Sequence, residues 1–173
     1  MILMIRVEQV LESWKAIRQD TAAAVEDFPA AELDYRPTPD VMSFRETARH
    51  ILDAGEGLTG LLLAGETDLT AADIRQRMAS HMPALPKDAG APELAAALRE
   101  AVARRAAELA ARPPEFFAQM VTRFDGQKVT RLEMLQMIKE HELTHRQQLF
   151  LCLRLKGLVP ATTRRRQAQQ AGR

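Results

Sequence analysis

The feature that most constrains this chain is a run of 27 residues, 130–156, that contains neither glycine nor proline. The run begins with Thr130 and Glu133, which have the spacing of a capping box, and it is followed by Gly157 and Pro160, which stop a helix. At 1.5 Å per residue, such a run forms a helix about 40 Å long. We therefore expect one long helix late in the chain, against which the other elements pack.

One face of this expected helix carries inward-facing positions that include two histidines. The positions alternate in spacing between four and three residues, as in a bundled helix: Met134, Ile138, His141, His145, Gln148, Cys152 and Leu155. His141 and His145 stand one turn apart on one face, near enough to bind one ion. They could instead be buried histidines that hydrogen-bond to neighbouring helices. However, two partly desolvated imidazoles need two partners, and a single metal ion satisfies both.

Residues 141–145 read HELTH, which fits the HExxH pattern of zinc peptidases, where the glutamate is a general base. Those enzymes take a third ligand from further along the chain, whereas residues 146–173 contain no His, Asp or Glu. A third ligand must therefore come from upstream, which argues against a peptidase. Glu142 has two interpretations: a catalytic proton acceptor at the site, or one half of an ion pair with Arg146, one turn later.

The composition favours helices packed through aliphatic side chains. Hydrophobic residues make up 46% of the 173 residues, and aromatic residues only 5%. A single cysteine, Cys152, excludes an internal disulfide and suits a reducing compartment. The apolar run at the N-terminus is too short for a signal peptide, and no stretch reaches about 18 apolar residues. We therefore expect a cytoplasmic protein without a membrane partner.

Charge is distributed unevenly along the chain. The formal net charge is +1, and residues 161–173 hold four arginines and no acid, so removing these four charges leaves −3 for residues 1–160. A mildly acidic body is a poor surface for nucleic acid, and we expect no nucleic-acid partner. The tail 161–173, which contains the run Arg164-Arg165-Arg166, is polar and without periodicity, and we expect it to be disordered.

Upstream of the long helix, helical periodicity and capping signals predict three more main helices and one short one. The expected order is a helix over 3–27, a proline-rich connection over 28–42, a helix from Ser43 to Gly65, a short helix over 70–82, and a helix over 92–112. Residues 115–129 are expected to form a short extended segment and a turn. The expected fold class is all-α, a four-helix bundle over residues 1–160 with a short extra helix between helices two and three.

Two stretches of the sequence resemble a known family. LDYRPTPDVMSFRETARHI (33–51) and HELTHRQQLFLCLRLKGLVP (141–160) are similar to the first half and the last helix of the DinB-like (YfiT-like) metalloprotein superfamily. Arg146 and Gln148 match the family's ending, whereas Gln147 stands where the family commonly has glycine. The resemblance covers nearly the whole chain, from the first helix to Pro160, and implies a four-helix bundle of this type.

The resemblance also implies a metal ion held by His50, His141 and His145. Three neutral imidazoles suit Zn, Ni, Fe or Co, and not Ca or Mg. Members of the superfamily with an assigned activity include thiol-dependent S-transferases and a mycothiol-dependent isomerase. We therefore expect a metal-dependent thiol S-transferase or hydrolase that acts on a small molecule, with a low-molecular-weight thiol as a cosubstrate. We also expect a homodimer. The alternative is a metal-binding, stress-associated protein without turnover. His81, beside prolines, is expected at the surface.

Overall fold

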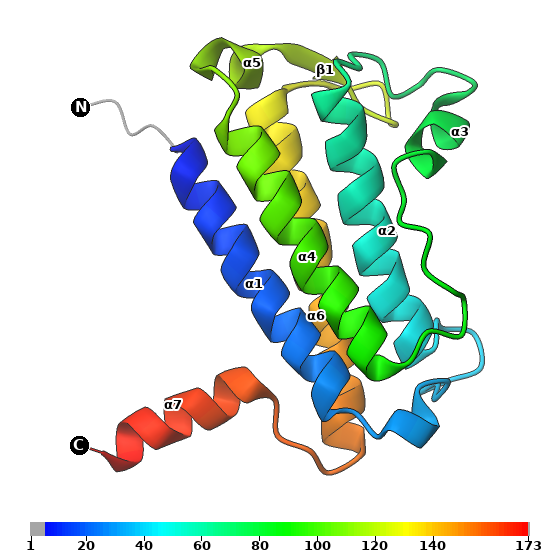
Figure 1. Cartoon of the computed structure of the whole chain (residues 1–173), viewed down its shortest axis with the longest axis vertical. Helices are drawn as coiled ribbons and strands as arrows, with labels where there is room; N and C mark the ends of the chain where they lie inside the picture. Colours follow the sequence, from blue (N-terminus) through cyan, green and yellow to red (C-terminus); the bar gives the residue numbers. More distant parts are fainter. Residues whose placement is uncertain (1–5, 173) are drawn as a thin grey trace.

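The computed structural model describes residues 6–172 and shows four long helices packed side by side (Figure 1). These are α1 (Val7–Asp27), α2 (Phe44–Leu63), α4 (Ala91–Ala110) and α6 (Arg131–Leu155). α1 packs against α4 and α6, and α2 packs against the same two helices. The expected four-helix bundle is confirmed. The first helix was expected to begin at residue 3, and residues 3–5 lie outside the described part of the chain.

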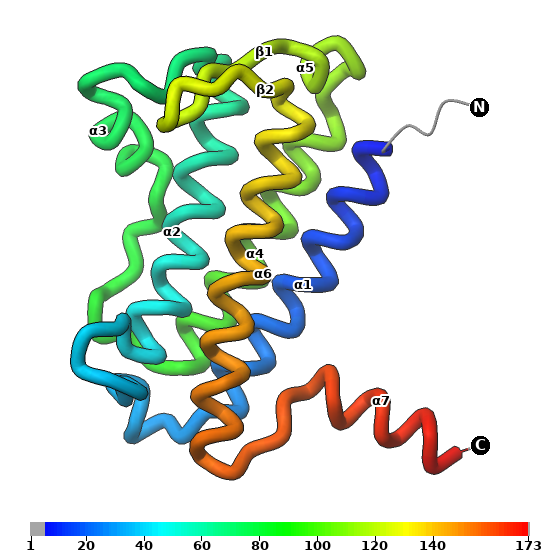
Figure 2. Tube along the Cα trace, turned by 180° about the vertical axis from the view of Figure 1, so that it is seen from behind, coloured from blue at the N-terminus to red at the C-terminus, as the bar shows by residue number. Residues whose placement is uncertain are grey.

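The four helices do not simply alternate in direction. α1 and α6 run one way along the bundle, and α2 and α4 run the other way (Figures 1 and 2). The connection between α2 and α4, residues 64–90, therefore returns along the length of α2 and carries the short helix α3 (Ile74–Ala79). Arg45 and Arg49 of α2 hold this crossover in place by donating hydrogen bonds to backbone carbonyls between residues 83 and 89.

Capping boxes fix where two of the long helices begin. The Ser43 hydroxyl accepts a hydrogen bond from the Glu46 amide, and the Glu46 carboxylate accepts one from the Ser43 amide. Thr130 and Glu133 make the same reciprocal pair at the start of α6. After α6, Gly157 has a φ of +75°, a conformation that glycine adopts without steric cost. Local sequence signals thus set the ends of the helices that carry the candidate site.

Short elements cover the two ends of the bundle. Near the start of α6 lie α5 (Pro114–Ala118) and an antiparallel hairpin of β1 (Met120–Thr122) and β2 (Lys128–Thr130) (Figure 2). Of the extended segment and turn expected over 115–129, residues from 120 onward form the hairpin, whereas residues 115–118 belong to the helix α5. A 3-10 helix, Ala30–Glu32, follows α1 at the other end. Within residues 6–172, no helix is both long and apolar enough to cross a membrane.

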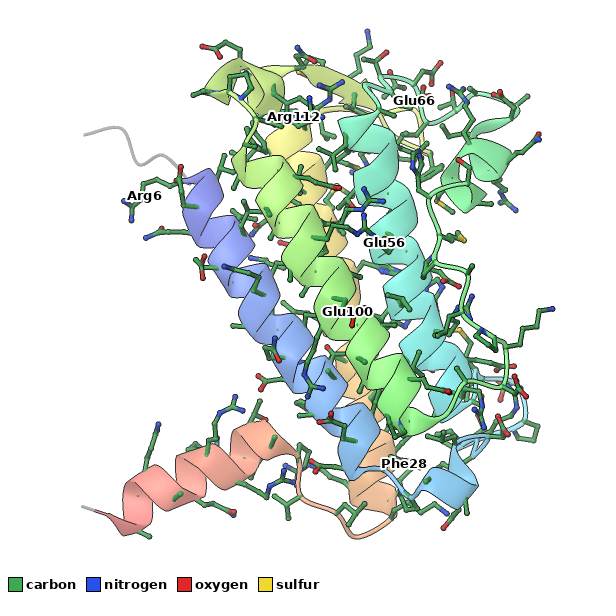
Figure 3. The ribbon with its side chains drawn as sticks, in the orientation of Figure 1. Arg6, Phe28, Glu56, Glu66, Glu100 and Arg112 are labelled. Carbon is green, nitrogen blue, oxygen red and sulfur yellow. The ribbon has the colours of Figure 1, made fainter. Side chains whose placement is uncertain are left out.

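The interior of the bundle consists of two apolar clusters with buried polar side chains between them. One cluster contains the residues nearest the C-terminal ends of α1 and α6, and the other contains those nearest their N-terminal ends. Buried polar residues of α1, α2 and α6 lie between the stretches of these helices that contribute to the two clusters: Arg18, Thr21, Glu56, Thr59 and Glu142. Figure 3 shows Glu56 between α2 and α4, where it pairs with Arg104 and Arg105.

The C-terminal tail is helical, so the expectation of disorder is wrong. Helix α7 (Ala161–Ala171) begins after Pro160 and projects sideways from the bundle (Figure 1). Arg164 pairs with Asp27 and Arg165 pairs with Asp20, both on α1. Two of the three adjacent arginines therefore have partners within the chain. The sequence did not reveal these partners, because they lie far upstream.

Candidate metal centre

His50, His141 and His145 lie together, half-buried, where α2 and α6 face each other. Because the two helices are antiparallel, His50 near the start of α2 is level with the middle of α6. The Nε2 atom of His141 lies 3.1 Å from Nε2 of His50 and 3.1 Å from Nε2 of His145. The ring centroids are 4.5 to 4.9 Å apart. The fold thus brings the three histidines singled out from the sequence to one point.

The spacing of these nitrogen atoms fits a bound transition metal. Two ligands at 2.0–2.1 Å from a tetrahedral zinc ion are separated by about 3.3 Å. The two Nε2 separations of 3.1 Å are close to this value. Imidazole nitrogen is a ligand for Zn, Ni, Fe and Co. All three ligand atoms lie within 4.8 Å of one another, so the residues present could hold a divalent transition metal.

Burial favours the metal-binding, neutral form of two of the histidines, His50 and His141. Burial lowers the pKa of His141 to about 4, and the neighbouring His145 and His50 add to this effect. Burial and the proximity of His145 likewise lower the pKa of His50 below its ordinary value. A histidine must be neutral to bind a metal ion. His141 is therefore neutral and available at pH 7.

Gln148 fixes the orientation of one of the rings. Its side-chain oxygen Oε1 lies 2.8 Å from Nδ1 of His145. When Nδ1–H donates to this oxygen, the lone pair is on Nε2, which faces the other two histidines. The sequence had placed Gln148 on the inward seam and in the family resemblance but had not assigned it this contact. The i,i+3 spacing from His145 was the signal that could have shown it.

Acidic residues near His50 have different roles. Asp53, one turn after His50, is half-buried, and its negative charge favours the protonated form of His50 against the effect of burial. Burial raises the pKa of Asp53, although its ion pair with Arg49, at 2.9 Å, acts in the opposite direction. Glu46 is engaged in the capping box and with Arg36. Asp53, which the sequence did not single out, is thus an acidic group close to the histidine cluster.

Glu142 does not form the ion pair with Arg146 that was one of its two interpretations. It is buried, and its carboxylate accepts hydrogen bonds from Trp14 and Arg18 of α1 at 2.7 to 2.9 Å. Arg146 forms an ion pair with Asp20 of α1 instead. Its Nη1 atom lies 3.6 Å from Oδ2 of Asp20. The role of catalytic proton acceptor stays a prediction. To fill that role, Glu142 would have to leave its partners on α1.

Two other expected residues lie apart from the cluster. Cys152 is buried in the core, as expected, and burial raises the pKa of its thiol. His81 is half-buried rather than at the surface, because it packs against the bare backbone of Gly60 on α2. A Cβ atom at Gly60 would lie 2.3 Å from Cγ of His81. His81 is not part of the three-histidine cluster.

The fold and the site define a four-helix bundle that presents three histidines from two antiparallel helices. The family model described as the DinB superfamily matches residues 13–149, a range that contains all three histidines. The chain therefore belongs to the DinB superfamily. No curated protein matches the sequence.

Solved structures show the same fold at low sequence identity. The DinB-like protein YjoA from Bacillus subtilis is 22% identical with a TM-score of 0.67, and the match covers 86% of this chain and 92% of that one. YfiT from Bacillus subtilis, described as a probable metal-dependent hydrolase with an unusual four-helix bundle topology, is 18% identical with a TM-score of 0.65 and 91% coverage of both chains. A mycothiol-dependent maleylpyruvate isomerase is 14% identical with a TM-score of 0.64, and the match covers 84% of this chain and 61% of that one.

We predict that replacing any one of His50, His141 and His145 with alanine weakens cobalt or zinc binding by more than about 100-fold. Loss of a direct ligand should exceed the 10–100-fold effect typical of losing an outer partner. Competition with a chromophoric chelator measures the affinity, and His81→Ala is the matched control that should bind as the wild type does. Loss of binding in His81→Ala, together with normal binding in His50→Ala, would show that the ligands are misassigned.

We also predict that the metal-free protein loses stability as the pH falls from about 6.5 towards 4. In that window the unfolded chain protonates His141 near its ordinary pKa of 6.5, whereas the folded protein resists protonation until about 4. The unfolded state therefore binds more protons, and stability rises with pH. Urea unfolding of chelator-treated protein between pH 5 and 7 measures this slope, and His141→Gln should flatten it. Parallel curves for the two proteins would contradict the assignment.

Proposed function

We propose that this protein is a metal-dependent enzyme that acts on a small molecule, as a thiol S-transferase or a hydrolase. The proposal depends on one observation: three imidazole nitrogens, from His50, His141 and His145, lie together. Among residues 6–172, no fourth His, Cys or carboxylate belongs to this cluster. A structural zinc site has four protein ligands, whereas a catalytic one has three and keeps a position for another molecule. The donor set suits Zn, Ni, Fe or Co.

The metal, when bound, would act as a Lewis acid that lowers the pKa of a thiol or of a water molecule. The chain's own part is to present neutral donors in a fixed arrangement. His141 is neutral at pH 7 because of its low pKa, and Gln148 holds the ring of His145. The half-buried location also strengthens electrostatic interactions relative to water. These properties support a reactive centre.

The part of α6 that follows the histidines carries exposed apolar side chains. On α6, Leu151 and Leu155 follow Gln148 at three and seven residues, a spacing that puts them on the same face of the helix. Both are more than half exposed, at 53% and 55%, so the expectation that Leu155 faces inward is wrong. Exposed large apolar side chains beside a polar site can cover the apolar part of a ligand. We propose that the substrate lies along this face of α6.

Two relatives lend support to the two reaction types. YfiT is described as a probable metal-dependent hydrolase, and the isomerase is described as mycothiol-dependent. We favour thiol transfer, with a low-molecular-weight thiol as the cosubstrate. A cytoplasmic location, where such thiols stay reduced, and assembly as a homodimer belong to the same proposal. The alternative is a metal-binding protein without turnover, which would have the same ligands but accept no substrate.

Cobalt substitution distinguishes these functions. We expect that glutathione, mycothiol or bacillithiol, added to the Co(II)-loaded protein, produces a sulfur-to-cobalt charge-transfer band in the near ultraviolet, because thiolate binds metal ions directly. His145→Ala should remove the band. A hydrolase should instead show a thiol-independent visible spectrum that changes with pH around 7. A spectrum untouched by both millimolar thiol and pH would favour binding without turnover, and failure to bind cobalt would overturn the proposal.

A further inference from the structure

We propose that Arg18 of α1 is a positioning residue for the metal centre. Through Glu142, it fixes the rotation of α6 that directs His141 and His145 towards His50. The inference rests on the proposed metal binding and assigns a role to residues that are not ligands. It also gives Glu142 a function different from that of a proton acceptor.

Arg18 contacts all four long helices from one buried guanidinium group. Its side chain, which belongs to α1, is 1% exposed. Its Nε and Nη2 atoms donate to the two oxygens of Glu142 on α6, at 2.7 and 2.9 Å, and Nη1 donates to the carbonyl of Leu98 on α4, at 3.1 Å. On α2, Gly55 leaves room for the guanidinium, since a Cβ atom there would lie 2.7 Å from Nη2.

The carboxylate of Glu142 is held from several directions. Besides the two bonds from Arg18, its Oε2 accepts a hydrogen bond from Nε1 of Trp14 at 2.7 Å. The Thr21 hydroxyl lies 3.0 Å from Oε1 and equally close to the carbonyl of Ile17, with one proton to donate to either. A planar guanidinium that binds both carboxylate oxygens restricts orientation as well as distance. Glu142 therefore cannot turn without losing several charge-assisted hydrogen bonds.

Glu142 lies in a stretch of α6 that has no other buried side chain. The buried side chains of α6 include Ile138 and Leu149, and between these two Glu142 is the one buried residue. It directly follows His141 and precedes His145 by three residues. No other side chain between Ile138 and Leu149 is buried to fix the rotation of this part of α6, so this rotation depends on the bonds of Glu142. The Arg18–Glu142 pair therefore sets the direction in which both histidines point.

The geometry shows how much a small rotation would matter. Side-chain tips lie about 6 Å from a helix axis, so a rotation of about 20° moves them by about 2 Å. This displacement equals the whole length of a metal–nitrogen bond, which is 2.0–2.1 Å. Outer groups that orient ligands typically change metal affinity by about 10–100-fold. We expect an effect of that size when Arg18 is lost.

The chain offers a matched control in a second buried ion pair. Glu56 of α2 is as buried as Glu142, with both at 2% exposure, and it pairs with Arg105 of α4 at 3.2 Å. The helix that carries Glu56 has buried apolar neighbours on both sides of it, among them Leu52 and Leu61, which also fix its rotation. Loss of this pair should reduce stability without redirecting a ligand.

The test compares the Co(II) affinity, the visible Co(II) spectrum and the melting temperature of wild type, Arg18→Met, Arg18→Lys and Glu56→Gln. We expect Arg18→Met to weaken Co(II) binding by about 10–100-fold and to change the Co(II) spectrum. Arg18→Lys should have a Co(II) affinity between those of the wild type and Arg18→Met. Glu56→Gln should lower the melting temperature but keep the wild-type affinity and spectrum. Wild-type affinity and spectrum in a destabilised Arg18→Met protein would overturn the inference. Absence of Co(II) binding to the wild type would instead overturn the proposed function.

A second pair of variants keeps the inference testable if Arg18→Met does not fold. The double variant Trp14→Phe/Thr21→Val removes two donors of Glu142 but retains the ion pair, and it should weaken Co(II) binding and alter the spectrum. Glu142→Gln separates positioning from base catalysis. A positioning role predicts a changed Co(II) spectrum, whereas a proton acceptor predicts an unchanged spectrum with reduced turnover. Wild-type spectra for both proteins would exclude the positioning role.

Discussion

The buried ion pair between Arg18 and Glu142 lies between the stretches of α1 and α6 that contribute to the two apolar clusters of the bundle. A buried charge is costly unless it is paired and hydrogen-bonded, so each partner requires the other. The donors come from α1, the acceptor is on α6, and the guanidinium also meets α2 and α4. One interaction thus connects the four helices beside the cluster of three histidines.

The topology determines which residues meet at the centre. Because α2 and α4 run parallel and are joined by a long crossover, α2 can lie antiparallel to α6. His50 therefore meets His141, 91 residues later in the sequence, at an Nε2 separation of 3.1 Å. The arrangement leaves the three histidines half-buried, and burial lowers the pKa of His50 and His141. A bundle with this chain order is a suitable frame for an accessible metal centre.

Local patterns in the sequence predicted most of the fold. Capping pairs such as Thr130 with Glu133 act within one helical turn, and their effect is visible without any tertiary contact. The histidine pair on α6 was equally visible, because i,i+4 spacing fixes a shared face. The partner of Glu142 was not visible, since Arg18 lies 124 residues away and nothing local connects them. For the same reason the helical tail was missed, because Arg165 pairs with Asp20 of α1.

We propose that α2 and α6 together hold one transition-metal ion. Anomalous diffraction from crystals of the zinc- or cobalt-loaded protein, recorded on both sides of the metal's absorption edge, would locate this ion. We expect one strong anomalous peak per chain, about 2.0–2.1 Å from the Nε2 atoms of His50, His141 and His145. A metal-loaded crystal without a peak at that position, or with its peak at other residues, would contradict the proposal.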